Sequence, residues 1–180
     1  MDNTMALLLS DTYKQCHDRM YPKGLTKLVS YWVPRKSMLE NQNEMVFFGL
    51  QAFIKEYLMG YFQKNFFELS EDEMLSLYTD SMDVQIGRDN YDLDKIVELH
   101  RLGYLPLEIR ALPEGTLVPM GVPCIEITNT DDKFAWLVQW IECGPATSPT
   151  TDPVPIHTNG VRIISSFVFP VTKIPISIAR

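Results

Sequence analysis

Cysteine and histidine are scarce in this sequence, with three of each among 180 residues. The cysteines are odd in number, widely spaced and without any Cys-x-x-Cys pair; they are Cys16, Cys124 and Cys143. Such a pattern indicates neither a disulfide framework nor a zinc site, so reduced thiols are expected. The histidines show no metal-ligand spacing either; they are His17, His100 and His157. We therefore expect the chain alone to hold no metal ion.

Basic residues are outnumbered, and long apolar runs are missing. The 16 lysines and arginines stand against 23 aspartates and glutamates, which gives a formal net charge of -7 and a pI near 4.9. This disfavours a nucleic-acid binder, because affinity for phosphates comes mainly from basic side chains. The apolar run from Met5 to Leu9 is far too short to span a bilayer, and Asp2 stands where a secretory signal carries positive charge. We expect a cytoplasmic protein that binds neither nucleic acid nor membrane.

The remaining composition is ordinary for a globular protein, with 46% hydrophobic and 22% charged residues, enough for one domain with a real core. Residues 26–33 are rich in β-branched and aromatic side chains and predict a strand. Apolar residues recur every three or four positions from Val46 to Tyr61, which predicts an amphipathic helix. Both elements have an apolar face that another part of the chain must cover.

The rest of the first 143 residues predicts three further helices and a group of strands. Residues 70–73 form a capping box at the start of one helix, and a second helix spans about 92–103, with His100 packed on its apolar face. Short apolar runs broken by Pro-Glu-Gly and Pro-Met-Gly predict a small β-meander over residues 107–128. Asp131 begins the last helix. Helices separated from a strand cluster predict an α+β fold.

The composition changes abruptly after Cys143. Residues 144–160 combine several prolines with serine and threonine, which predicts a linker. Residues 161–180 are apolar and β-rich but interrupted by two prolines, so they form edge strands or stay unpaired. The predicted parts are an amino-terminal α+β domain over residues 1–143, a linker over 144–160 and a tail over 161–180.

An acid and an aromatic ring lie close together near the start of the chain, in the run Ser10-Asp11-Thr12-Tyr13-Lys14. On residue type alone, Asp11 is a good helix N-cap and Tyr13 a half-buried aromatic. The same pair can also grip a flat, amide-bearing ring, since the phenol stacks and a carboxylate accepts from an amide. The residues by themselves leave both interpretations open.

Several segments in the same order resemble the amino-terminal part of the nicotinate/nicotinamide phosphoribosyltransferase family. That family carries an Asp-x-Tyr-Lys segment near its start, followed by a histidine, as this chain does with Asp11, Tyr13, Lys14 and His17. The resemblance runs from about residue 7 to 142. The other segments that carry it are Phe47-Phe48-Gly49-Leu50-Gln51, Leu105-Pro106-Leu107-Glu108-Ile109, Pro113-Glu114-Gly115-Thr116, Asn129-Thr130-Asp131, Trp136-Leu137 and Trp140-Ile141-Glu142.

The resemblance implies a mixed sheet with several helices, like the amino-terminal domain of type II phosphoribosyltransferases, here without the α/β barrel. It implies the reaction of nicotinamide with phosphoribosyl pyrophosphate to give nicotinamide mononucleotide and pyrophosphate, in NAD salvage. In the complete family enzyme, Mg²⁺ accompanies the phosphoribosyl pyrophosphate, and the enzyme is a homodimer. The family's remaining substrate-binding and catalytic groups follow Trp140, where this chain has Thr147-Ser148-Pro149 instead. We therefore expect a truncated amino-terminal portion that is inactive alone.

Three substrate-binding residues and no catalytic residue are implied for this chain. Tyr13 would stack on the nicotinamide ring and Asp11 would lie near its carboxamide, both reaching across a dimer interface into the partner's site. Arg35 matches a family arginine that helps to bind phosphate, whereas on residue type alone it is a solvated loop residue. Lys14 and His17 match family positions without a definite role.

Other functions stay open at this stage. A catalytically silent dimerisation or binding module would keep the interface segment around Asp11 without the reaction centre. A nicotinate phosphoribosyltransferase shares the architecture, although Asp11 would repel the carboxylate of nicotinate. A lipoyl-type carrier is disfavoured because neither Pro-Gly turn displays a lysine. Without a barrel against it, residues 1–143 would expose an apolar face, which predicts self-association.

Overall fold

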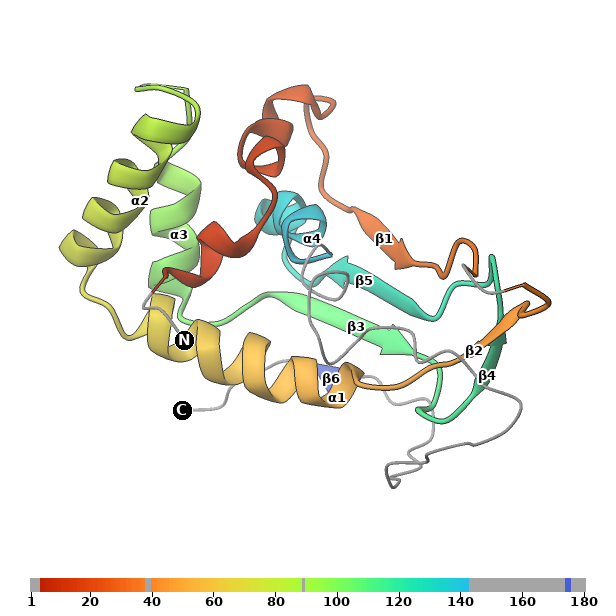
Figure 1. Ribbon diagram of the computed structural model, residues 1–180. Coiled ribbons are helices and arrows are strands. Elements are labelled where there is room, and N and C mark those ends of the chain that lie inside the picture. The colour runs from red at the N-terminus through yellow and green to blue at the C-terminus, as the bar shows by residue number, and fades with distance from the viewer. Residues whose placement is uncertain (1–3, 38–39, 89, 143–173, 176–180) are drawn as a thin grey trace.

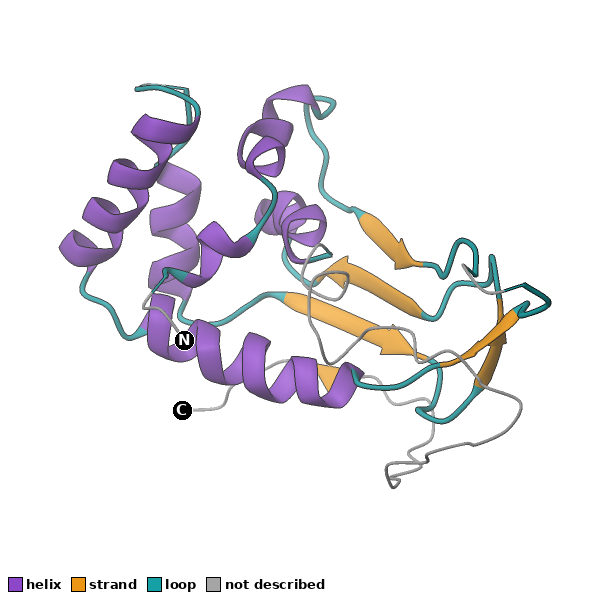
Figure 2. Ribbon diagram, viewed as in Figure 1, coloured by secondary structure: helices purple, strands orange, loops and turns teal. Residues whose placement is uncertain are grey.

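The computed structural model describes residues 4–37, 40–88, 90–142 and 174–175. A central antiparallel sheet is flanked by helices, with a two-stranded ribbon at one end (Figures 1 and 2). The helical elements are η1 (Ala6–Leu9), η2 (Thr12–Met20), α1 (Leu50–Ala52), η3 (Phe53–Tyr61), η4 (Gln63–Phe67), α2 (Glu71–Gln85), α3 (Asp94–Leu102), η5 (Asp132–Phe134) and α4 (Ala135–Ile141). The strands are β1 (Val29–Trp32), β2 (Glu44–Val46), β3 (Leu107–Ala111), β4 (Leu117–Pro119), β5 (Ile125–Asn129) and β6 (Ile174–Pro175). This arrangement confirms the α+β prediction, and the described residues form no barrel.

The central sheet has the order β1-β5-β3-β6, and all its pairs are antiparallel. Side chains alternate between its faces, as the two-residue period of a strand requires. Ile109 pairs with Ile127 in register, and both are buried on the side of the core. Arg110 pairs with Glu126 on the other side and is exposed. The predicted strand over residues 26–33 is confirmed as β1.

The predicted β-meander is wrong in its pairing. In a meander each strand pairs with the next along the chain, but here β3 pairs with β5, while β4 leaves the sheet and pairs with β2. Met45 and Val118 face each other in that ribbon and are both buried. The turn signals were correct, but the partner of β4 lies some seventy residues earlier in the chain, beyond the reach of local sequence patterns.

The first long helix begins later than its periodicity predicts. Val46 belongs to β2 and pairs with Leu117, so the expected helix start there is wrong. Gly49 turns the chain with φ 101°, a left-handed conformation that glycine adopts without a Cβ penalty, and α1 follows at once. The segments α1, η3 and η4 run on from one another as the long helix at the bottom of Figure 1. Its middle has wider π-type hydrogen bonds, as from Phe62 N–H to Tyr57 O.

Helix α2 begins at its predicted capping box, and α3 begins two residues after Asp92 and ends at the predicted Gly103. The Ser70 hydroxyl accepts a hydrogen bond from Glu73 N–H at the start of α2, which is one half of the capping box. Gly103, with φ 76°, closes α3 in the left-handed conformation. His100 packs edge-on against Phe66, and its Nε2 lies 3.0 Å from Leu69 O, in agreement with a packing role.

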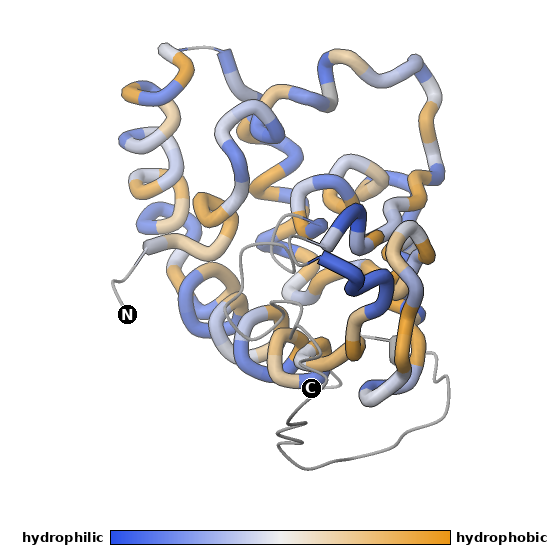
Figure 3. Tube along the Cα trace, turned by 45° about the vertical axis from the view of Figure 1, so that its right-hand side comes forward, coloured by the Kyte–Doolittle hydropathy of each residue, from blue (hydrophilic) through white to orange (hydrophobic). Residues whose placement is uncertain are grey.

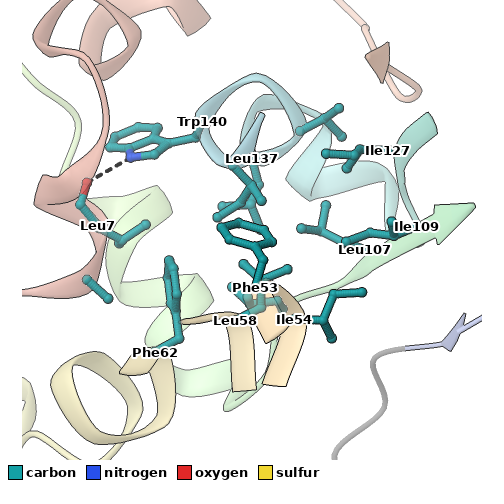
Figure 4. Close-up of a cluster of buried hydrophobic side chains, with 14 of the residues drawn as sticks. Leu7, Phe53, Ile54, Leu58, Phe62, Leu107, Ile109, Ile127, Leu137 and Trp140 are labelled. Carbon is teal, nitrogen blue, oxygen red and sulfur yellow. Dashed lines mark hydrogen bonds between the residues drawn. The ribbon is translucent and has the colours of Figure 1, made fainter. Parts of the chain in front are cut away.

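The core lies between the sheet, the long helix and α4. Figure 4 shows Leu107, Ile109 and Ile127 from the sheet beside Phe53 and Ile54 of the long helix and Leu137 of α4. Six of the seven residues of α4 are buried, which makes it the most enclosed helix of the described chain; they are Ala135, Trp136, Leu137, Val138, Trp140 and Ile141. Along the helices in Figure 3, apolar and polar residues alternate around each turn, as amphipathic packing requires.

The predicted linker (144–160) lies outside the described residues, as does most of the predicted tail (161–180). From that tail, β6 is described as a two-residue strand at the edge beside β3. Large apolar side chains are exposed at several places, Met20 and Val84 most of all. Self-association of the domain stays a prediction. No helix in the described part of the chain is both long and apolar enough to cross a membrane.

Candidate functional site

Helix η2 presents the acid and the aromatic ring at its first turn. Lys14 N–H donates to Asp11 O over 2.9 Å, which starts the helix immediately after Asp11. The side chain of Asp11 is exposed, and that of Tyr13 is 53% exposed. Both can therefore be reached from solvent, which contact with a ligand or a second subunit requires. Thr12 between them donates from Oγ1 to Gln85 Oε1 of α2 over 2.9 Å.

The next residue of η2 turns inward. The Lys14 side chain is only 6% exposed, and its Nζ lies 2.6 Å from Glu142 Oε1, just after the end of α4. Glu142 itself is 32% exposed, so the carboxylate lies at the border between core and solvent. This ion pair joins two segments that are 128 residues apart, and it ties the first turn of η2 to α4.

One amide of α4 holds two further residues of this segment. Gln139 Oε1 accepts from Tyr21 Oη–H over 2.7 Å and lies 3.2 Å from His17 Nδ1. Because an amide oxygen can only accept, this pairing places the proton of a neutral His17 on Nδ1. Residues of α4 and of the position just after it thus hold η2 at its first turn, at its middle and immediately after its last residue; α4 lies next to η2 in Figure 1.

A buried hydrogen-bond network fixes the chain just before η2. Leu7 O accepts from Trp140 Nε1 over 2.8 Å, the bond drawn in Figure 4, and from Gln15 Nε2 over 3.2 Å. Gln15 Oε1 in turn accepts from the Tyr78 hydroxyl over 3.1 Å. These buried polar groups are hydrogen-bonded, which stabilises one orientation of η1 and η2.

The ring of Tyr13 is bordered by two of the anchored residues. The His17 ring lies edge-on to it, with 5.0 Å between the centroids and a 62° angle between the planes. Lys14 Nζ lies 5.3 Å from the Tyr13 centroid, within the range of a cation–π contact. With these two neighbours in place, Tyr13 still exposes about half of its surface.

Arg35 is not brought to this pair. It is exposed in the loop after β1, whereas η2 precedes that strand, so the two lie at opposite ends of β1 (Figure 1). The loop is fixed beside the ribbon, because Gly121 N–H donates to Pro34 O over 2.7 Å. Within this chain, Asp11 and Tyr13 form one candidate patch and Arg35 another.

The described residues hold no group of three or more histidine, cysteine, aspartate and glutamate side chains that could bind a metal ion. Mg²⁺ that accompanies a phosphorylated substrate is usually held by one or two carboxylates together with the substrate's phosphate oxygens.

The thiols of Cys16 and Cys124 are free and differ in burial, Cys16 being half-buried and Cys124 buried. Burial raises the pKa of the Cys124 thiol to about 11, because the thiolate loses hydration. At pH 8 roughly one Cys124 in a thousand would be ionised, and only the thiolate reacts. We expect iodoacetamide to modify Cys16 and to spare Cys124 until the chain is unfolded, as peptide-resolved mass spectrometry would show. Equal rates at both positions in the folded chain would contradict the buried placement.

Sequence reasoning missed Gln139 and Glu142. Both are polar residues at the end of an otherwise apolar helix, three positions apart and so on one face. That spacing among buried neighbours was a usable signal that α4 contacts a polar partner. Nothing in the sequence indicated that the partner would be η2.

Comparison with known proteins identifies the family of this chain. The sequence model of the family described as nicotinamide phosphoribosyltransferase, N-terminal domain, matches residues 5–109, which include η1, η2, the first strands and the long helix. The match covers more than half of the chain, and the chain belongs to this family.

Individual relatives match a longer stretch of the chain than the family model does. A nicotinamide phosphoribosyltransferase of Acinetobacter baylyi is 40% identical over 137 residues, covering 73% of this chain and 27% of the relative. One of Xanthomonas campestris pv. campestris is 31% identical over 140 residues, covering 76% and 27%. The crystal structure of human nicotinic acid phosphoribosyltransferase superposes with a TM-score of 0.49 at 19% identity, covering 75% of this chain and 24% of that one. The chain thus spans about a quarter of the length of the relatives that it matches.

Proposed function

We propose that this chain is the amino-terminal portion of a nicotinamide phosphoribosyltransferase and that it supplies part of the nicotinamide subsite. The observation that supports this most is the solvent-accessible pair Asp11 and Tyr13 on a segment fixed from behind by α4, in a chain of this family. The complete enzyme would join nicotinamide to phosphoribosyl pyrophosphate in the presence of Mg²⁺, releasing pyrophosphate, in the cytoplasm.

The two residues have different parts in this proposal. Tyr13 stacks on one face of the pyridine ring, and Asp11 accepts from the carboxamide N–H. Because Asp11 and Arg35 lie at opposite ends of β1, the proposal assigns them to different sites of a homodimer. In a two-fold dimer, each subunit then lends Asp11 and Tyr13 to the partner's site and uses its own Arg35 to bind phosphate.

A chimera tests this proposal directly. Residues 7–142 of this chain would replace the aligned segment of the Acinetobacter baylyi enzyme, to which the chain is 40% identical. We expect the chimera to form nicotinamide mononucleotide and the 180-residue chain alone to form none. A folded, dimeric chimera without activity would instead support the alternative of a non-catalytic dimerisation module.

Removal of the stacking ring should weaken nicotinamide binding. In the chimera, Tyr13→Ala is expected to raise the KM for nicotinamide roughly fivefold, because aromatic stacking contributes about 1 kcal/mol. The matched control is Tyr31→Ala, since Tyr31 is 55% exposed but lies on β1, away from η2. Steady-state kinetics with nicotinamide varied would measure both. Equal effects of the two substitutions would count against a stacking role for Tyr13.

Neutralising the acid should change the preference between amide and acid substrates. Asp11→Asn removes a repulsion that, between unit charges 4 Å apart in water, amounts to about 1 kcal/mol. We therefore expect the ratio of kcat/KM for nicotinamide to that for nicotinate to fall roughly fivefold. Asp80→Asn, at an exposed position of α2, is the control. A wild-type chimera that prefers nicotinate would favour the nicotinate phosphoribosyltransferase instead.

A further inference from the structure

Two side chains at the end of α4 fix the two residues that border the Tyr13 ring. Glu142 holds Lys14 over 2.6 Å, and Lys14 Nζ lies 5.3 Å from the Tyr13 centroid. Gln139 lies 3.2 Å from His17 Nδ1, and the His17 ring lies edge-on to Tyr13 at 5.0 Å. Two sequences of contacts therefore join the end of α4 to the exposed ring of Tyr13, one through Lys14 and one through His17.

Helix α4 is suited to hold His17 and Lys14 because it is well packed. Six of its seven residues are buried, it lies against β1 and β5 of the sheet, and Trp140 Nε1 donates a hydrogen bond to Leu7 O. Gln139 and Glu142 are the half-buried residues at its polar edge. A well-packed element that carries a polar edge is the kind of support that holds a binding residue in one orientation.

We propose that Gln139 and Glu142 are positioning residues for Tyr13, acting through His17 and Lys14 to keep its ring in the orientation that stacks on the pyridine. This inference rests on the proposed function and adds the residues that prepare the subsite. An exposed tyrosine that turned freely would lose rotamer freedom on binding and would bind more weakly. The contact with the His17 ring and the position of Lys14 Nζ over the Tyr13 ring reduce that freedom in advance.

The first test uses the full 180-residue chain and needs no activity. Gln139→Met keeps the length of the side chain but removes the acceptor, whereas Gln139→Glu keeps an acceptor oxygen for His17 and Tyr21. At a pH where His17 is neutral, ¹⁵N NMR should show its proton on Nδ1 in the wild type and in Gln139→Glu. Gln139→Met should lose this tautomer signature together with the nuclear Overhauser contact between the rings of His17 and Tyr13.

The second test measures kinetics in the chimera. Gln139→Met and Glu142→Gln are each expected to raise the KM for nicotinamide roughly threefold, as for a released side chain, with little change in kcat or in the KM for phosphoribosyl pyrophosphate. Gln139→Glu should restore the wild-type KM. Glu98→Gln is the control, because it breaks an exposed ion pair with Lys133 that joins α3 to η5 and not to η2. A merely structural role would lower the active fraction and leave both KM values unchanged.

The outcomes separate this inference from the function on which it rests. If Tyr13→Ala leaves the KM for nicotinamide unchanged, the proposed stacking function fails. If Tyr13→Ala raises it but Gln139→Met and Glu142→Gln do not, the function stands and the positioning role is overturned. A wild-type His17 that carries its proton on Nε2 would also overturn the role of Gln139.

Discussion

Replacing Trp140 with alanine is expected to destabilise the folded chain by about 3 to 5 kcal/mol. The side chain is only 3% exposed and lies edge-on to Trp136, with 5.0 Å between the ring centroids. Its loss leaves a cavity between α4 and η1 and removes the hydrogen bond to Leu7 O. Since that carbonyl also accepts from Gln15, it keeps one partner, and most of the effect comes from the cavity.

Urea unfolding followed by circular dichroism would measure this change in the free energy of unfolding. Trp140→Phe should lie between the wild type and Trp140→Ala, because it retains much of the ring but cannot donate to Leu7 O. Leu117→Ala, at a position that is 55% exposed, should change stability by less than about 0.5 kcal/mol. A Trp140→Ala chain as stable as the wild type would show that α4 does not hold η1 in the way described.

This dependence matters for the candidate site because η2 follows η1 directly. Trp140 fixes Leu7, and Leu7 O also fixes Gln15 within η2. Loosening of this contact would therefore move the segment that carries Asp11 and Tyr13. We expect Trp140 variants to impair nicotinamide binding in the chimera even where the domain still folds.

Signals that act within a few residues were predicted correctly from the sequence. The capping box at Ser70 and the glycine closure at Gly103 follow from backbone chemistry inside one or two turns. Asp131 likewise begins the last helical segment, its carboxylate accepting from Lys133 N–H. In each case the residue type and its nearest neighbours determine the local conformation.

Long-range pairings could not be predicted in this way. The ribbon of β2 and β4 depends on partners about seventy positions apart, and the apolar period around Val46 fitted a helix as well as a strand. Gly49 was the available sign of a break, since a glycine before a helix permits the left-handed turn seen there. The pairing of β2 with β4 therefore decided the conformation around Val46, although the local apolar period also fitted a helix.

For the candidate site, the sequence identified the exposed candidate residues but missed Gln139 and Glu142, which hold the neighbours of Tyr13 in place. The resemblance identified Asp11, Tyr13 and Arg35 as candidates, and the structure leaves all three exposed while placing Arg35 at the other end of β1. Lys14 had no definite role from residue type, because its partner Glu142 lies 128 residues away. Only the fold shows that Lys14, next to Tyr13 in the sequence, attaches η2 to the end of α4 through its ion pair with Glu142.

The Lys14–Glu142 pair should respond unequally to removal of its two members. Glu142→Gln takes a carboxylate away from an ammonium on a side chain that is 6% exposed, and we expect it to destabilise the chain by about 2 kcal/mol. This is less than the full effect for a buried pair, because Glu142 is 32% exposed and water reaches the site. Lys14→Met should cost about 1 kcal/mol or less, since methionine fills similar space and the remaining carboxylate can turn to solvent.

Unfolding of both variants and of the double variant in urea at pH 7 would measure the order of these effects. We expect the variant with both Lys14→Met and Glu142→Gln to be nearly as stable as Lys14→Met alone. Once the Lys14 ammonium is absent, the Glu142 carboxylate has no buried charge to neutralise, so its removal costs little. Lys133→Met, which breaks the exposed pair with Glu98, should have almost no effect. If Lys14→Met proves more destabilising than Glu142→Gln, the ammonium is not the buried member of the pair, and the anchoring of η2 through Lys14 would have to be abandoned.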